Sequence, residues 1–239
     1  MTLGTFYGLG VGPGDPGLVT VKAAAVLART HHVFVPKARI AAESVALDIA
    51  RQYLGADAEV RELVFPMTED RAELAKSWTA SAGAIARVLE SGADACFLTL
   101  GDPLVYSTYV YLLRALTQQL PEVCSVTVPG VTAFCAGAAL ANFPLGERKE
   151  LLTIIPTADD LQPVCDALQR GGTVVLMKIG KRLQEILALL QEAGLIDRAV
   201  FVSHAGQEGQ RVELDLRRLY AEAPEAGYLS VILVHAGKS

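Results

Sequence analysis

A glycine and an aspartate directly follow an apolar run, and they are the residues of this chain best placed for chemistry. Residues 94–100 have the length and composition of a buried parallel strand, and Gly101-Asp102-Pro103 comes next. Gly101 lets a ligand approach the backbone, while Asp102 could bind a ribose or amino group or cap the following helix. Because open α/β sheets bind ligands at the carboxyl ends of their strands, this junction predicts a small-molecule site.

A second strand-to-loop junction, near the start of the chain, has the spacing of a dinucleotide-binding loop. The segment Gly12-Pro13-Gly14-Asp15-Pro16-Gly17 matches G-x-G-x-x-G, but its two prolines lack the backbone donors that a pyrophosphate needs. The acidic residue expected after the second strand is missing, since Val35-Pro36-Lys37 stands there. Because Lys37 and Arg39 could bind a 2′-phosphate, NADPH is an alternative ligand. The other alternative is a tight turn that binds no ligand.

A third turn of small residues, Pro129-Gly130-Val131-Thr132-Ala133, stands between a predicted strand and a predicted helix. It would permit close approach of a flat group such as adenine, or Thr132 would simply cap the helix, and spacing does not separate the two. Basic residues near the predicted loops would suit a polycarboxylate substrate, although each alone fits a solvated surface. They are Lys37, Arg39, Arg148, Lys149, Lys178, Lys181 and Arg182.

Composition narrows the class of protein. The chain has 239 residues, 51% of them hydrophobic and 20% charged, which suits one large α/β domain or two small ones. A formal net charge of -5 argues against nucleic-acid binding, and no apolar run reaches the roughly 18 residues of a membrane helix. The four cysteines form no Cys-x-x-Cys pair and the four histidines have no ligand spacing. We therefore expect free thiols in a reducing cytoplasm, no secretory signal and no bound metal.

Strand and helix patterns alternate along the chain and predict two α/β domains. The polar stretch at Pro121 is the best candidate boundary, which gives an N-terminal domain 1–121 and a C-terminal domain 122–239. Alternation in the first half predicts a parallel sheet, and a hairpin turn at 204–210 makes the second sheet mixed. Strands are expected at 5–11, 32–35, 60–65, 94–100, 126–128, 151–155, 173–178, 199–203, 211–215 and 229–234. Helices are expected at 19–29, 42–54, 69–89, 107–119, 133–140, 160–169 and 182–193.

Taken together and in this order, four segments are similar to those of the tetrapyrrole methyltransferase family, which uses S-adenosylmethionine in cobalamin and sirohaem synthesis. They are Gly8–Pro16, Gly101–Pro103, Val128–Ala133 and Val175–Met177, and the resemblance covers nearly the whole chain. Three further features resemble the branch that methylates carbon 20 of precorrin-2 or its cobalt complex. These are Phe65–Asp70, Trp78 and Leu104–Tyr109.

The resemblance implies two α/β domains with the active site in a trough between them, usually in a homodimer. It also implies a tetrapyrrole substrate and a folded S-adenosylmethionine at the domain interface. Since that cofactor carries an activated methyl group, no metal is needed on the enzyme. The methylated carbon must lose a proton, and Asp102 and Tyr228 are the candidate acceptors. By motif position, the cofactor would be lined by Pro13, Gly101, Asp102, Val105, Thr132, Ala133, Met177, Ala205 and Ser230.

Several other functions stay open at this point. Another tetrapyrrole methylase, or diphthine synthase, would have the same fold, and an NADPH-dependent reductase would share the glycine-rich turn. A regulator on this fold would bind the cofactor without transferring its methyl group.

Overall fold

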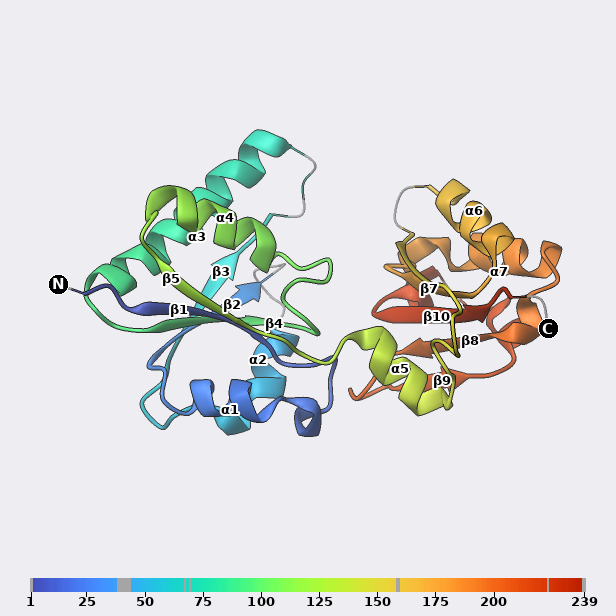
Figure 1. The fold of residues 1–239 in the computed structure, drawn as a ribbon, viewed down its shortest axis with the longest axis horizontal. Coiled ribbons are helices and arrows are strands. Elements are labelled where there is room, and N and C mark those ends of the chain that lie inside the picture. The colour runs from blue at the N-terminus through green and yellow to red at the C-terminus, as the bar shows by residue number, and fades with distance from the viewer. Residues whose placement is uncertain are drawn as a thin grey trace. The chain divides into compact units, whose positions relative to one another are not determined.

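Two five-stranded sheets with helices packed against them organise this α/β chain (Figure 1). The chain divides into two compact units, residues 1–132 and residues 133–239. The first sheet is all-parallel and the second is mixed, which confirms the prediction for both halves. The computed structural model describes residues 2–37, 44–66, 68, 70–157, 160–222 and 224–237.

The first sheet has the strand order β3-β2-β4-β1-β5, with β4 at its centre. All five residues of β4 are buried, as expected for a parallel strand that is covered on both faces. Helices α3 and α4 pack on one face and α1 and α2 on the other (Figure 1). The strands are β1 (Thr5–Gly10), β2 (His32–Lys37), β3 (Glu59–Val64), β4 (Ala95–Thr99) and β5 (Cys124–Val128). The helices are α1 (Val21–Leu27), α2 (Val45–Ala50), α3 (Arg71–Glu90) and α4 (Tyr109–Gln119).

Strand β5 places the division between the units later than the sequence does. It pairs in parallel with β1, from Thr5 opposite Cys124 to Leu9 opposite Val128. A boundary at Pro121 would assign this strand to the second domain, whereas the contacts put the division between Thr132 and Ala133. The hydrogen-bonded ladder with β1, and not the polar stretch before β5, decides where the first unit ends.

The second sheet has the order β6-β7-β10-β8-β9, and β10 is antiparallel to both of its neighbours. The predicted hairpin is present between β8 and β9, and its return strand is shorter than expected. Helices α6 and α7 contribute to the main core, while α5 packs on β8 and β10. None of the described helices is both long and apolar enough to cross a membrane. The elements are α5 (Ala133–Ala141), β6 (Leu152–Pro156), α6 (Gln162–Arg170), β7 (Thr173–Met177), α7 (Leu183–Glu192), β8 (Ala199–Ser203), β9 (Arg211–Glu213) and β10 (Ser230–His235).

Gly8, in the middle of β1, makes room for the buried ring of Tyr109 at the start of α4. A β-carbon at Gly8 would lie 2.6 Å from the Tyr109 hydroxyl oxygen and still closer to the ring carbons. The hydroxyl group shares a hydrogen bond of 2.8 Å with Thr127 Oγ1 on β5, and burial raises the pKa of Tyr109. The first glycine of the Gly8–Pro16 segment thus serves the packing of α4 on the sheet.

We predict that Gly8→Ala lowers the free energy of unfolding by about 1–3 kcal/mol, because the added methyl group overpacks the Tyr109 ring. Urea denaturation followed by circular dichroism measures this change. The matched control is Gly146→Ala, at a glycine whose β-carbon would meet no atom within 4 Å. Equal stability of the two variants would contradict the packing role of Gly8.

Candidate functional site

Three glycines bring bare backbone together at the carboxyl edge of the first sheet. Gly10 ends β1, Gly101 follows β4 and Gly130 follows β5, and these strands are neighbours. A β-carbon on Gly10 would lie 2.5 Å from the Gly130 nitrogen and 2.7 Å from the Gly101 carbonyl oxygen. Any larger residue at Gly10 would force these three segments apart, so main chain packs directly on main chain at this edge.

The two glycine-rich bends found in the sequence are hydrogen-bonded to each other. The Gly101 N–H donates to the Gly12 carbonyl oxygen at 2.8 Å, and the Gly12 N–H donates back to the Gly101 oxygen at 3.3 Å. Both residues have positive φ, 79° at Gly12 and 72° at Gly101, which glycine adopts without strain. The edge is therefore one hydrogen-bonded structure, built from segments about ninety residues apart in the sequence.

Asp102 links the bend after β4 to the bend after β5. Its Oδ1 accepts a hydrogen bond from the Leu104 N–H at 2.8 Å, and its Oδ2 accepts one from the Gly130 N–H at 3.0 Å. It does not cap the next helix, since α4 begins at Tyr109 and the Ser107 hydroxyl oxygen accepts from the Tyr109 N–H there. The carboxylate thus fixes the backbone of this edge, and proton transfer by Asp102 stays a prediction.

The first loop lacks the features of a dinucleotide cradle. After Pro13 the chain forms a single 3-10 turn, in which Asp15 Oδ1 accepts from the Gly17 N–H at 2.7 Å. The Tyr53 hydroxyl donates to the Pro16 carbonyl oxygen at 2.9 Å, which fixes the loop against the rest of the unit. Helix α1 starts only after this turn, so its amino end does not meet the loop as it does in dinucleotide-binding proteins.

Some of the basic residues proposed to bind a 2′-phosphate or a polycarboxylate are paired with carboxylates in the structure. Lys37 Nζ lies 2.6 Å from Glu62 Oε2, and Arg182 Nη2 lies 2.8 Å from Glu185 Oε2. Each charge is already neutralised by a neighbouring carboxylate, which weakens the NADPH alternative. Arg39 lies outside the described residues. The exposed members of the set are Arg148, Lys149, Lys178 and Lys181.

The second unit has its own edge of unusual backbone, where three neighbouring strands meet turns. Ser230 of β10 lies opposite Ser203 of β8, and Met177 of β7 lies opposite the next residue of β10, Val231. The residues next to them, Lys178, His204 and Leu229, have φ of 55°, 50° and 46°. Such conformations cost non-glycine residues of order 1–3 kcal/mol each and cluster at functional sites. This edge is therefore the functional candidate of the second unit.

Hydrogen bonds hold the strained edge in place. The His204 N–H donates to the Leu229 carbonyl oxygen at 3.0 Å, which ties the end of β8 to the start of β10. The N–H and Oγ1 of Thr157 both donate to the Met177 carbonyl oxygen, at 2.8 and 3.1 Å. Thr157 is fully buried, and no pattern in the sequence points to its role. His204 was also not predicted, because its conformation depends on Leu229, which is distant in the sequence.

The predicted site residues fall on these two edges. Ala205 is buried after His204, and the Ser230 hydroxyl donates to the Gly227 carbonyl oxygen at 2.7 Å, so it serves the local fold. The Tyr228 side chain is 64% exposed, with its ring centroid 6.2 Å from that of His204. The trough between the domains stays a prediction. The first unit contains Pro13, Gly101, Asp102, Val105 and Thr132, and the second contains Ala133, Met177, Ala205, Tyr228 and Ser230.

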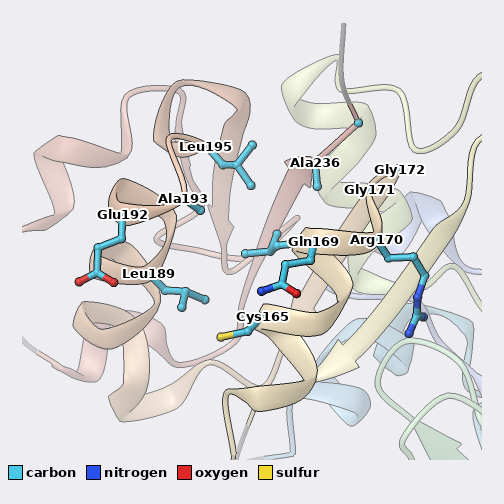
Figure 2. Close-up of a pocket in the computed structure, with 12 residues that line it drawn as sticks. Cys165, Gln169, Arg170, Gly171, Gly172, Leu189, Glu192, Ala193, Leu195 and Ala236 are labelled. Carbon is cyan, nitrogen blue, oxygen red and sulfur yellow. The ribbon is translucent and has the colours of Figure 1, made fainter.

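A pocket of about 680 Å³ in the second unit lies elsewhere (Figure 2). Gly171 and Gly172, which precede β7, and Ala236, which follows β10, line it. It is therefore at the opposite edge of the sheet from Met177 and Ser230, and none of the predicted site residues lines it. Glu192 and Arg170 point away from each other, so they do not converge on a ligand (Figure 2).

Comparison with known proteins identifies the family of this chain. The model of a family described as Tetrapyrrole (Corrin/Porphyrin) Methylases matches residues 5–219. The chain belongs to the tetrapyrrole methylase family. This family membership confirms the resemblance drawn from the glycine-rich segments, and these segments form the edge described above.

Relatives and a solved structure extend the match over nearly the whole chain. The cobalt-precorrin-2 C(20)-methyltransferase of Salmonella typhimurium is 40% identical over 97% of this chain and 96% of its own. A probable cobalt-precorrin-2 C(20)-methyltransferase of Methanocaldococcus jannaschii is 36% identical over 82% and 83%. The uroporphyrin-III C-methyltransferase of Thermus thermophilus, solved with S-adenosyl homocysteine, has a TM-score of 0.66 at 21% identity and covers 97% of both chains. The last likeness shows a common fold.

The residues of the first edge fit the methyl donor of this family, S-adenosylmethionine. Gly10 and Gly101 are buried and Gly130 is half-buried, so their backbones pack on one another and leave little side-chain bulk at this edge. Asp102 holds two of these segments together.

We predict that Asp102→Asn weakens binding of S-adenosyl homocysteine by about tenfold or more. An amide presents an NH₂ group to one of the two backbone donors, so the edge loses its fixed geometry, and re-forming it on binding costs about 1–3 kcal/mol. Isothermal titration calorimetry measures the affinity. The matched control is Asp94→Asn at the amino end of the same strand, where Oδ1 accepts from the Thr5 N–H at 2.7 Å. Equal affinities for the two variants would remove Asp102 from the site.

Proposed function

We propose that this chain is the S-adenosylmethionine-dependent methyltransferase that methylates carbon 20 of cobalt-precorrin-2 in cobalamin biosynthesis. The observation that carries the proposal is 40% identity to the Salmonella enzyme over 97% of the chain. Membership in the tetrapyrrole methylase family and the backbone edge at Gly101 support the same reaction class.

Orientation is the main contribution that this chain makes to the reaction. S-adenosylmethionine supplies an activated methyl group when bound, so the protein has to hold the donor and the ring carbon in line. Well-oriented reactants gain roughly 7–11 kcal/mol in favourable systems. The Asp102 carboxylate contributes by fixing the backbone at Leu104 and Gly130, to which it is hydrogen-bonded. In this role Asp102 is a positioning residue for the cofactor edge.

The methylated ring carbon must also release a proton. Tyr228 is proposed near this step because its side chain is exposed and its ring lies 6.2 Å from that of His204. Asp102 is the other candidate, although both of its oxygens already accept hydrogen bonds from backbone N–H groups. Because a neutral phenol is a poor base, we propose that Tyr228 positions the ring and that a water molecule beside it receives the proton.

The cobalt form is the preferred substrate within the proposal, because two relatives at 40% and 36% identity carry cobalt-precorrin-2 in their names. Action on metal-free precorrin-2 is the alternative within the same branch. A homodimer in the cytoplasm completes the proposal and rests on the resemblance to the family. A diphthine synthase or an NADPH-dependent reductase lacks support, since the relatives point to tetrapyrroles and Lys37 is paired with Glu62.

The direct test combines the purified protein with methyl-labelled S-adenosylmethionine and either cobalt-precorrin-2 or metal-free precorrin-2. We predict that the label appears at carbon 20 and that the cobalt form turns over faster. Carbon NMR of the product locates the methyl group, and Asp102→Ala, assayed in parallel, should transfer it more slowly. A methyl group at another carbon, or no transfer from a protein that binds S-adenosyl homocysteine, would contradict the proposal.

A further inference from the structure

Two histidines and a glutamate converge at the amino ends of β2 and β3. His32 and Glu59 are direct partners in the parallel pairing of these strands, and the Glu59 N–H donates to the His31 carbonyl oxygen at 2.7 Å. One ligand atom from each of the three side chains lies within 4.8 Å of the other two. Because Glu59 is far from the histidines in the sequence, the strand register alone brings this set together.

The Nδ1 atoms of both imidazole groups lie close to carboxylate oxygens. Nδ1 of His32 is buried without a hydrogen-bond partner and lies 3.4 Å from Glu59 Oε2. Nδ1 of His31 lies 3.5 Å from Asp57 Oδ2, and the two rings meet edge to face with centroids 4.7 Å apart. A buried ring nitrogen without a hydrogen-bond partner is costly, and a cation bound by it and by the carboxylate oxygen would satisfy both groups.

We propose that His31, His32 and Glu59 form a peripheral site for a divalent transition-metal ion, with Asp57 as an additional carboxylate beside it. Imidazole with carboxylate suits Zn²⁺, Co²⁺ and Ni²⁺, whereas Mg²⁺ and Ca²⁺ prefer all-oxygen sites. The nitrogen ligands must approach to about 2.0–2.1 Å from a zinc ion. His31 and Glu59 can turn toward the ion because about half of each side chain is exposed.

Arg61 competes with the metal for Glu59. Its Nε and Nη2 donate to the two Glu59 carboxylate oxygens at 3.0 and 2.8 Å. A bound cation must displace this guanidinium group or share the carboxylate with it, and its positive charge opposes the cation. Removing the Arg61 charge should therefore tighten metal binding, which a merely structural role of the histidines would not predict.

The site lies away from the residues proposed for methyl transfer. His32 and Glu59 begin their strands, whereas Gly101 and Asp102 follow the carboxyl end of β4 in the same parallel sheet. A bound ion would link β2, β3 and the turn at Asp57. It would stabilise the folded first unit, since a ligand that binds only the folded state shifts unfolding by mass action.

The test titrates Zn²⁺ and Co²⁺ separately into untagged, chelator-treated protein that carries Cys124→Ser and Cys135→Ser, because the two exposed thiols could bind zinc themselves. We expect one equivalent to bind by calorimetry, visible absorption from the Co²⁺ complex without a thiolate band, and a higher urea midpoint. His32→Gln should weaken affinity by more than the roughly tenfold that follows loss of an outer-shell partner. Arg61→Gln should bind more tightly than the parent protein.

A comparison of Glu59→Gln with Glu62→Gln tests whether the Glu59 carboxylate binds the metal. Both residues lie on β3 and pair with a cation, but Glu62 pairs with Lys37, away from the histidines. Glu59→Gln should weaken binding, while Glu62→Gln leaves it unchanged, and circular dichroism confirms that each variant is folded. Absence of stoichiometric binding, or unchanged binding in a folded His31→Gln/His32→Gln variant, would overturn the proposal.

Discussion

The close approach of main chain at Gly10, Gly101 and Gly130 is the constraint on which the first unit depends. Three parallel strands end side by side, and their bends touch without side chains between them. Asp102 then ties two of the bends together through a pair of N–H···O hydrogen bonds. Because the backbone positions at this edge are already fixed, the proposed binding of the cofactor there would require little additional ordering.

The second unit also has a strand edge with unusual backbone conformations. Gly227 approaches the Gly180 backbone closely there, and three larger residues, Lys178, His204 and Leu229, also adopt positive φ. The His204–Leu229 hydrogen bond and the Thr157 contacts with Met177 offset part of the cost of this strain. In both units, hydrogen bonds therefore hold the backbone at one strand edge in a fixed conformation, which is typical of sites that must be rigid before a ligand arrives.

Much of the fold follows from local patterns in the sequence. The apolar run before Gly101 predicts β4, and the glycines between two short apolar runs predict the β8–β9 hairpin. The boundary at Pro121 does not follow, because the pairing of β5 with β1 is a contact between distant segments. The segment Ala42–Leu54, predicted as one helix, begins outside the described residues, and its described part contains the shorter helix α2 and a 3-10 turn.

The candidate site likewise combines residues that the local sequence identifies with contacts between segments that are distant in the sequence. Motif order identifies Gly101 and Asp102, and the structure adds what Asp102 contacts. A glycine is needed at position 8 because the ring of Tyr109 occupies the space of a side chain there, and Tyr109 lies about a hundred residues further along the chain. The meeting of His32 with Glu59 depends on strand register and is equally invisible in the linear sequence. Sequence spacing identifies residues whose contacts are local. Contacts between strands can be identified only once the order and register of the sheet are known.

Hydrogen–deuterium exchange with and without S-adenosyl homocysteine tests the central claim most directly, because it reports on backbone amides. The account predicts slower exchange, on ligand addition, in peptides that cover residues 10–14, 100–106 and 129–133. Peptides that cover 189–195, beside the pocket between α6 and α7, should exchange at an unchanged rate. Protection at 189–195, with none at the edge formed by Gly101, would contradict the account.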